Sequence, residues 1–322
     1  MQYRRLGRAG VRVSTIALGS WLTYGSSVAE EAATQCIHKA YELGINFFDT
    51  ANAYNHGEAE KVVGRALRDF ARDSFVLATK VYFPMGEGPN DRGLSRKHIM
   101  EQCHASLRRL GTDYIDLYQC HRYDPEVPLE EVLRALDDLV TQGKVLYVGV
   151  SEWSAIAIDD AVHMARELNL DRIVSNQPVY NMLVRYVERE VLPLCEREGI
   201  GQVVFSPLAQ GILTGKYKPG QQPPQGTRAA DPQSNSFMQD MLNDKVLTAV
   251  QKLQTLAQQH SYTLAQIALA WVLRKPIISA AIIGASRPQQ VEENAKASEI
   301  TLTDDLLHRI DEILGDVVKY ER

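Results

Sequence analysis

Four side chains with complementary chemistry lie at or just after short apolar runs: Asp49, Tyr54, Lys80 and His121. Each run is typical of a buried strand in a parallel sheet. We expect the four side chains to meet where these strands end, because barrel enzymes collect their catalytic groups at the carboxyl ends of different strands. A carboxylate, a phenol, an ammonium and an imidazole held together can deliver a proton to a bound molecule. The four residues therefore predict an enzyme.

The elements that would position these residues follow from an alternation of short apolar runs with amphipathic segments, which is typical of βα units around a parallel sheet. The strand-like runs are Thr15–Gly19, Ile45–Asp49, Phe75–Lys80, Ile115–Cys120, Val145–Val150, Ile173–Gln177, Val203–Ser206 and Ala280–Ile283. The helix-like segments are Glu31–Leu43, Glu58–Phe70, Arg96–Leu110, Leu129–Gln142, Ser154–Leu168, Arg185–Glu198 and Leu264–Leu273. This count matches a (β/α)8 TIM barrel of the α/β class.

A doubly wound sheet is the competing architecture, since coarse periodicity alone does not exclude it. A nucleotide-binding sheet of that kind carries G-x-G-x-x-G after its first strand, whereas this chain has Leu18-Gly19-Ser20-Trp21-Leu22 there. We therefore predict one barrel domain over residues 1–322. We also expect an N-terminal β-hairpin over residues 3–13 that plugs the barrel floor. A long loop after strand 7, over residues 211–239, is expected to be functional because it exceeds a routine connection.

The composition is that of a globular protein, with 45% hydrophobic and 23% charged residues and a formal charge of −5. This charge provides no basic footprint for nucleic acid and no polybasic patch for a membrane. No signal peptide is evident and no run approaches the ~18 apolar residues of a membrane span, so we expect a cytoplasmic protein. The four cysteines include no C-x-x-C pair, which favours reduced thiols and no metal site: Cys36, Cys103, Cys120 and Cys195.

Several motifs resemble those of the aldo-keto reductases, and the resemblance runs nearly end to end, from Leu18 to Asn294. The motifs that carry it are Gly44–Ala51 followed by Tyr54, Ala78–Lys80, Gly149–Ser151, Ser206–Leu208, Gly284–Ser286 and Glu293-Asn294. Two segments, Arg92–Ile99 and Gly211–Tyr217, are most similar to the branch of voltage-gated potassium channel β subunits and their bacterial relatives. The resemblance implies a barrel that binds a nicotinamide dinucleotide without the missing glycines, and a homo-oligomer, since the branch often forms tetramers.

The resemblance also implies an order among the four residues. Tyr54 would donate the proton to the developing alkoxide, although a free phenol, with a pKa of about 10, is a sluggish acid near neutrality. The charge of Lys80 would favour the phenolate, and Asp49 would hold Lys80 in place. His121 would donate to the carbonyl oxygen of the substrate. Each residue taken alone is more often an ordinary exposed side chain or a helix N-cap, but the joint spacing favours the site.

By the same resemblance the cofactor is NADP(H), bound along the barrel rim. The implied cofactor contacts are Ser20, Trp21, Asp49, Ser151, Glu152, Gln177, Phe205, Ser206, Pro207, Leu208, Gln210, Lys216, Arg228, Gly284, Ser286, Gln290, Glu293 and Asn294. Ala285, Gln290 and Glu152 stand where many relatives carry lysine, arginine, and asparagine or arginine. The first two departures remove positive charge near a 2′-phosphate, yet NADPH is expected over NADH. The expected substrate wall is Trp21, Tyr54, Tyr82, Phe83, His121 and Trp153.

The function that these implications favour is NADPH-dependent reduction of an aldehyde or ketone to an alcohol. The alternative is a redox-sensing auxiliary subunit that binds NADPH with little turnover and regulates a partner such as a channel. A barrel isomerase unrelated to nicotinamide is a third possibility, but it leaves Lys216, Ser286 and Asn294 unexplained. Small aldehydes, methylglyoxal and triose phosphates all remain open as substrates.

Overall fold

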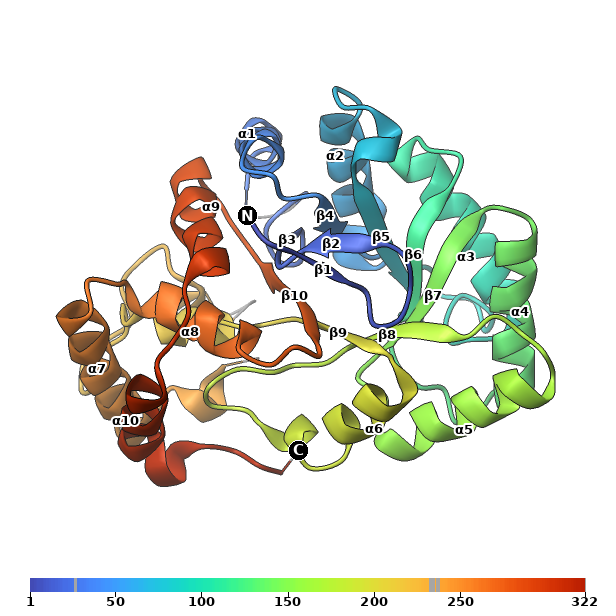
Figure 1. Cartoon of the computed structure of the whole chain (residues 1–322). Helices are drawn as coiled ribbons and strands as arrows, with labels where there is room; N and C mark the ends of the chain where they lie inside the picture. The colour runs from blue at the N-terminus through green and yellow to red at the C-terminus, as the bar shows by residue number, and fades with distance from the viewer. Residues whose placement is uncertain (26–27, 232–234, 236–237, 322) are drawn as a thin grey trace.

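Eight parallel strands close into a barrel in the computed structural model, which describes residues 1–25, 28–231, 235 and 238–321 (Figure 1). In order round the barrel they are β10 (Ile278–Ile283), β3 (Ile16–Gly19), β4 (Phe47–Asp49), β5 (Val76–Val81), β6 (Ile115–Cys120), β7 (Val145–Ser151), β8 (Ile173–Gln177) and β9 (Gly201–Val204). The predicted (β/α)8 fold is confirmed. Because β4, β5 and β6 are neighbours, Asp49, Lys80 and His121 come from adjacent strand ends.

Helices surround this barrel: α1 (Glu30–Glu42), α2 (Glu58–Leu67), α3 (Arg96–Leu110), α4 (Leu129–Thr141), α5 (Ala155–Glu167), α6 (Val191–Glu198), α7 (Asp244–Gln259), α8 (Leu264–Leu273), α9 (Pro288–Ala295) and α10 (Asp304–Leu314). Several of them begin at side-chain caps. Ser95 and Ser154 accept main-chain N–H groups at the starts of α3 and α5, and Thr263 forms a capping box with Gln266 at α8.

The predicted bounds differ from the structure in places where tertiary contacts act. The helix expected from Arg185 begins at Val191, because the main-chain N–H of Arg185 bonds to Lys319 and its guanidinium pairs with Asp311 at 2.8 Å. The seventh barrel strand ends at Val204, so Phe205 and Ser206 lie beyond it. Helices α7, α9 and α10 were not anticipated from the sequence.

The N-terminal hairpin closes one end of the barrel, as predicted. Strands β1 (Tyr3–Arg5) and β2 (Arg12–Ser14) pair antiparallel and lie across the barrel end (Figure 1). Leu6, Ala9 and Val13 are buried in the same apolar cluster as the inward side chains of the strands. Gly7 has φ +57, and a Cβ there would lie 2.3 Å from the carbonyl oxygen of Gly199, so the turn requires glycine.

The long connection after β9 is also confirmed. Its described residues form only short 3-10 turns before α7, namely η4 (Ala209–Thr214), η5 (Arg228–Ala230) and η7 (Gln239–Met241). Residues 232–234 and 236–237 of the predicted loop lie outside the described residues. Tyr217 is buried within the connection, and Gln251 of α7 donates to the main-chain oxygens of Gly215 and Tyr217. The described part of the loop is therefore anchored on α7.

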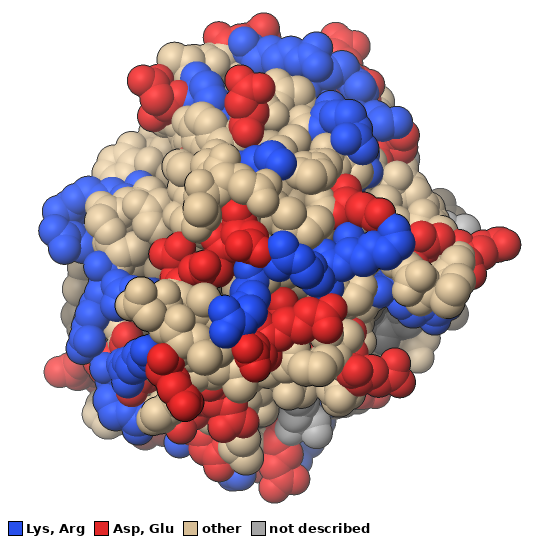
Figure 2. All heavy atoms as spheres, turned by 90° about the vertical axis from the view of Figure 1, so that its right-hand side faces the viewer, with Lys and Arg blue, Asp and Glu red and all other residues tan. Residues whose placement is uncertain are grey.

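Acidic and basic side chains are interspersed on the face that carries α3 and α4 (Figure 2). Arg96 and Asp138 form an ion pair between these helices at 2.5 Å, and Arg134 pairs with Glu130 along α4.

No helix within the described ranges has the length and apolar character needed to cross a membrane. The four cysteines are buried free thiols, and burial raises the pKa of Cys120 to about 12. That residues 1–322 fold as one unit stays a prediction.

Candidate active site

The buried ammonium of Lys80 is the centre of the candidate site. Lys80 lies near the carboxyl end of β5, with no exposed surface. Its Nζ donates to Asp49 Oδ1 at 2.5 Å, to the main-chain oxygen of Thr50 at 2.8 Å and to the Tyr54 hydroxyl at 3.2 Å. An ammonium has three N–H donors, so these contacts use all of them. Lys80 is thereby held against the phenol oxygen.

The second carboxylate oxygen of Asp49 is bonded from the opposite side of the barrel. Gln177 Nε2 of β8 donates to Asp49 Oδ2 at 2.9 Å, and Gln119 Nε2 of β6 approaches the same oxygen at 3.4 Å. Ser20 donates to the hydroxyl of Thr50 at 2.8 Å. Asp49 of β4 is therefore linked to three other strands, β5, β6 and β8, and its orientation toward Lys80 is fixed by partners on both oxygens.

Tyr54 lies on a short turn, η1 (Tyr54–Gly57), between β4 and α2. Gly57 has φ +90, and a Cβ there would lie 2.6 Å from Arg109 Cδ, so the Arg109 side chain packs directly on this glycine. Arg109 Nε in turn pairs with the buried carboxylate of Glu60 at 2.5 Å. These contacts fix the turn, and with it the direction in which the phenol enters the site.

Burial and charge act in opposite directions on Tyr54 and Lys80. Burial raises the pKa of Tyr54, and the nearby charge of Lys80 opposes that rise without cancelling it. Burial would lower the pKa of Lys80, but its interactions with the Asp49 carboxylate and with Tyr54 outweigh burial, and the pKa is raised. Lys80 is therefore charged and Tyr54 carries its proton near neutral pH. The sequence predicted the influence of Lys80 but not the larger influence of burial.

His121 is a buried imidazole at the end of β6. Its ring contacts the ring of Tyr54 edge to face, with centroids 5.6 Å apart, and the ring of Phe83 at 4.8 Å. Burial, followed by the charges of Lys80 and Arg122, holds the pKa of His121 well below its usual value. Its Nδ1 is buried and has no hydrogen-bond partner among the described residues. A neutral imidazole next to the phenol can donate to a ligand oxygen.

Aromatic side chains form the wall around these groups. The half-buried ring of Trp21 lies 6.5 Å from Tyr54 and 6.4 Å from Phe205 between ring centroids. Tyr82 contacts Phe83 at 5.3 Å. The structure thus brings five of the six residues of the expected substrate wall together: Trp21, Tyr54, Tyr82, Phe83 and His121. The sixth, Trp153, is only 3% exposed and packs on Tyr123.

The expected carboxamide contacts lie where β7 and β8 end. Ser151 is buried and donates to the main-chain oxygen of Gln177 at 2.9 Å. Glu152 has φ +58, and its carboxylate accepts from the main-chain N–H of Val179 at 2.7 Å and from the Tyr186 hydroxyl at 2.9 Å. The carboxylate therefore supports the loop between β8 and α6, and a contact between Glu152 and a cofactor stays a prediction.

The loop after β9 presents the next group of predicted contacts. Ser206 and Gln210 have positive φ and are linked by a hydrogen bond from Gln210 Nε2 to Ser206 Oγ, and Arg228 donates to Gln210 Oε1. Asn181 Nδ2 donates to the main-chain oxygen of Ser206. Lys216 is exposed, whereas Pro207 is buried and Leu208 is half-buried. At Ser206 and Gln210 the main chain is therefore held in the left-handed region, which costs energy for residues other than glycine. Such strained positions are frequent at ligand-binding sites.

The last predicted group follows β10. At Gly284 a Cβ would meet only Thr23 Cγ2, at 3.8 Å, so the main chain faces open space that a ligand could approach closely. The Ser286 N–H and hydroxyl both donate to Gln290 Oε1, at 2.8 and 3.2 Å. Glu293 is exposed, and Asn294 is buried. The open cradle at Gly284 fits a nucleotide cofactor bound along this rim.

Three side chains next to this site were not predicted from the sequence: Thr50, Gln119 and Arg122. Gln119 could have been found, because it alternates with Leu117 and His121 along β6 and must share their inward face. Apolar side chains usually fill the inside of a barrel, so a polar glutamine on that face indicates a functional position. Thr50 and Arg122 carry no comparable sequence signal.

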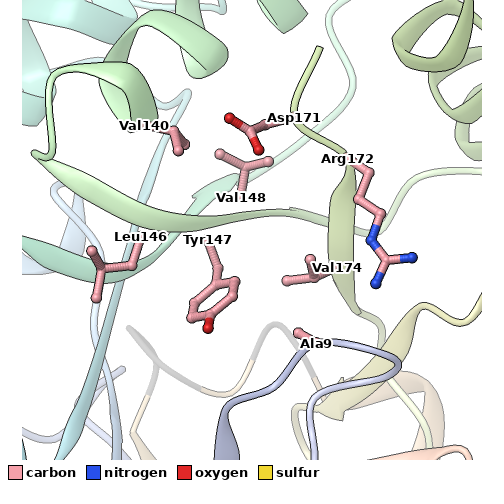
Figure 3. Close-up of a pocket in the computed structure, with 8 residues that line it drawn as sticks. All are labelled: Ala9, Val140, Leu146, Tyr147, Val148, Asp171, Arg172 and Val174. Atoms are coloured by element: carbon pink, nitrogen blue, oxygen red, sulfur yellow. The ribbon is translucent and has the colours of Figure 1, made fainter. Parts of the chain in front are cut away.

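The opposite end of the barrel carries a small hollow of about 170 Å³ (Figure 3). Its lining comes from the hairpin loop, from α4 and from the amino-terminal ends of β7 and β8: Ala9, Val140, Leu146, Tyr147, Val148, Asp171, Arg172 and Val174. None of these residues belongs to the candidate site. The acid–base groups gather only at the carboxyl end of the strands that the structure describes.

Fold and site together define a (β/α)8 barrel with a phenol–ammonium–carboxylate group and an imidazole at the carboxyl end of its strands. Residues 15–315 match the sequence model of the Aldo/keto reductase family. The chain therefore belongs to the aldo/keto reductase family, whose members generally use NADP(H).

Two kinds of relative are similar over nearly the whole chain. A putative voltage-gated potassium channel subunit beta of Schizosaccharomyces pombe is 45% identical, covering 97% of this chain and 93% of the relative. A probable subunit of the same kind from Arabidopsis thaliana is 41% identical, covering 98% and 97%. The L-glyceraldehyde 3-phosphate reductase of Escherichia coli is 37% identical, covering 98% and 93%. The resemblance read from the motifs is confirmed.

Proposed function

We propose that the protein reduces an aldehyde or ketone to the alcohol with NADPH, and that Tyr54 supplies the proton. The observation that carries the proposal is the contact of Lys80 Nζ with both Asp49 and the Tyr54 hydroxyl, 2.5 and 3.2 Å long. NADPH, when bound, supplies the hydride. The residues of the chain would orient the carbonyl, exclude water and move one proton.

Each residue has a separate task in this reaction. Tyr54 gives its phenol proton to the carbonyl oxygen as negative charge develops there. Lys80 stabilises the resulting phenolate, and Asp49 keeps Lys80 charged and in place. His121 is neutral and keeps one ring N–H, which it would donate to the carbonyl oxygen.

The rim residues would hold the cofactor. The ring of Phe205 supports stacking on the nicotinamide, since it contacts Trp21 at the mouth of the site. Ser151 and Gln177 would bind the carboxamide. Loop 206–210, with Lys216 and Arg228, would bind the pyrophosphate. Gly284, Ser286, Gln290, Glu293 and Asn294 would bind the adenosine end, where Ser286 would exchange Gln290 for phosphate oxygen.

The variant Tyr54→Phe tests the proposal. We expect it to lower the rate of carbonyl reduction by about 10²- to 10⁴-fold, because the proton donor is lost. NADPH binding, followed by the change in NADPH fluorescence, should stay nearly intact. A panel of aldehydes assayed with NADPH and with NADH would give both the substrate and the cofactor preference.

Tyr123→Phe is the matched control, since it removes one phenol oxygen from an exposed tyrosine near the same barrel end. It should retain both binding and turnover. If Tyr54→Phe loses NADPH binding together with turnover, Tyr54 is a structural residue and the proposed role is wrong. If the wild type reduces no aldehyde, the proposed function itself is wrong.

A second candidate function is favoured by the names of two of the relatives, which are described as channel β subunits. In that case the protein would bind NADPH with little turnover and regulate a membrane partner. Negligible turnover with tight cofactor binding, together with copurification of a channel, would support it. We place the protein in the cytoplasm and expect a homo-oligomer, which sedimentation of the purified chain would test.

A further inference from the structure

We propose that Arg122 is the anion-binding residue of the substrate pocket, and that the carbonyl substrate carries a carboxylate or phosphate group. The inference rests on the proposed reductase function and adds the chemical class of its substrate. Arg122 was not among the residues expected from the sequence.

Arg122 lies directly beside the groups that would hold the carbonyl. Its Nη1 donates to the main-chain oxygen of His121 at 2.6 Å, so the guanidinium folds back over the strand end. Its Cζ lies 5.4 Å from the centre of the Phe83 ring, which contacts the imidazole of His121 at 4.8 Å. Since that imidazole also contacts the ring of Tyr54 at 5.6 Å, the guanidinium borders the reaction centre.

Among the described residues, no carboxylate forms an ion pair with this guanidinium. Among the other arginines of limited exposure, Arg72, Arg109, Arg185 and Arg274 each pair with a carboxylate at 2.5 to 3.3 Å, and Arg4 bonds three main-chain oxygens instead. Arg122 is half-buried and pairs with no carboxylate among the residues that the structure describes. The acid nearest in sequence, Asp124, accepts main-chain N–H groups instead. A half-buried charge without an opposite charge beside it is unfavourable, and an anionic ligand would offset that cost.

The donors of Arg122 suit an anion. A guanidinium carries five N–H groups in a planar fork, and only Nη1 has a protein acceptor in the described structure. The remaining donors match the paired oxygens of a carboxylate or a phosphate. The charge of Arg122 also contributes to the lowered pKa of His121, after burial and Lys80, so its field reaches the carbonyl position. An anion bound there would be held close to the reacting carbon.

Two pairs of aldehydes test the inference, because each pair differs only in the anionic group. 4-Oxobutanoate and butanal differ by a carboxylate, and glyceraldehyde 3-phosphate and glyceraldehyde differ by a phosphate. We expect the wild type to prefer the charged member of at least one pair in kcat/KM. In Arg122→Gln that preference should fall about 10- to 100-fold, mainly through KM, because charge-assisted hydrogen bonds are lost.

Arg108→Gln is the matched control, since it removes the same charge from an exposed position on α3. It should leave the preference unchanged, which separates binding by Arg122 from the effect of net charge. Arg122→Lys should keep part of the preference, because a point charge remains without the planar fork. If Arg122→Gln lowers kcat/KM equally for both members of each pair, Arg122 only positions His121 and the inference is wrong.

A binding measurement separates this inference from the proposed function. Calorimetric titration of the NADP⁺-saturated protein with inorganic phosphate and with succinate should show binding that Arg122→Gln loses and Arg108→Gln keeps. Equal binding by all three proteins would contradict the inference. If the wild type reduces none of the four aldehydes, the reductase proposal fails, whereas loss of phosphate or succinate binding in Arg122→Gln would still support an anion site.

Discussion

The two ends of the barrel are built on different principles. At the amino-terminal end, the hairpin buries Leu6, Ala9 and Val13 among apolar side chains, and the Arg4 guanidinium bonds to three main-chain oxygens. At the carboxyl end, a lysine without any exposed surface is surrounded by a carboxylate, a phenol and an imidazole. The first arrangement buries apolar side chains and bonds its buried donors, whereas the second concentrates groups that are costly to bury.

Unpaired atoms and unusual backbone angles follow the same division. None of the buried polar side-chain atoms without a partner belongs to residues 1–14, whereas His121 Nδ1 and Trp153 Nε1 lie at or beyond the carboxyl strand ends. Apart from Asn169 and Ser261, every described non-glycine residue with positive φ follows the carboxyl end of a strand. Stability and chemistry are therefore separated along the barrel axis, as in barrel enzymes generally.

The largest expected effect comes from Lys80→Met. It should lower carbonyl reduction by about 10²- to 10⁴-fold, because the phenolate of Tyr54 loses its stabilising charge. It should also destabilise the fold by about 3–5 kcal/mol, because Asp49 is left as an unpaired buried carboxylate. Steady-state kinetics and urea unfolding would measure the two losses.

The double variant Asp49→Asn, Lys80→Met separates these losses. Removing both charges takes away the unpaired carboxylate, so most of the lost stability should return while activity stays absent. If activity returns with stability, the pair is structural and the division between the two barrel ends is wrong.

The next largest effect is expected at the hairpin end, where a substitution should lower stability and leave activity nearly unchanged. Leu6→Ala removes a fully buried side chain from the plug and should cost about 2–5 kcal/mol of unfolding free energy. Because the plug and the acid–base groups lie at opposite ends of the barrel, kcat/KM at 25 °C should change less than about twofold. Leu146→Ala, at a leucine that is 44% exposed beside the hollow, should cost less than about 1 kcal/mol. A large loss of activity in Leu6→Ala would show that the two ends are coupled.

Features of the two barrel ends that depend on local sequence patterns could be predicted, and features that depend on contacts between residues far apart in the sequence could not. The strands, the hairpin and the four acid–base residues could be predicted, because apolar alternation and local motifs carry them. The start of α6 could not, since Lys319 and Asp311, more than a hundred residues away, hold Arg185. The orientation of Glu152 depends on Val179 and Tyr186 in the same way. Partners distant in sequence leave no periodic trace, so they become visible only in the folded chain.

His121 provides a pH test of the carboxyl end. The pKa of His121 lies well below 6.5 in the folded protein, so below about pH 6.5 the unfolded chain binds a proton that the folded chain does not. Stability should therefore fall with decreasing pH by up to about 1.4 kcal/mol per pH unit from this residue. His121→Asn should lack this contribution to the pH dependence of stability, so its unfolding free energy should depend less on pH between 6.5 and 5. Parallel curves for the two proteins would contradict the lowered pKa.

The smallest expected effect concerns Gln119, where one side chain affects both the stability of the barrel and the positioning of Asp49. Gln119 donates to Asp49 only at 3.4 Å, while Gln177 donates at 2.9 Å, and Gln119 Oε1 is buried without a partner among the described residues. Gln119→Met removes an unsatisfied acceptor, so stability should stay equal or rise by about 1 kcal/mol. Turnover should fall by less than about tenfold, because Asp49 loses its weaker donor and holds Lys80 less firmly. Gln177→Met should lower turnover more, since it removes the shorter bond. A Gln119→Met variant that loses stability and keeps full turnover would mean that Gln119 belongs to the packing of the barrel rather than to its site.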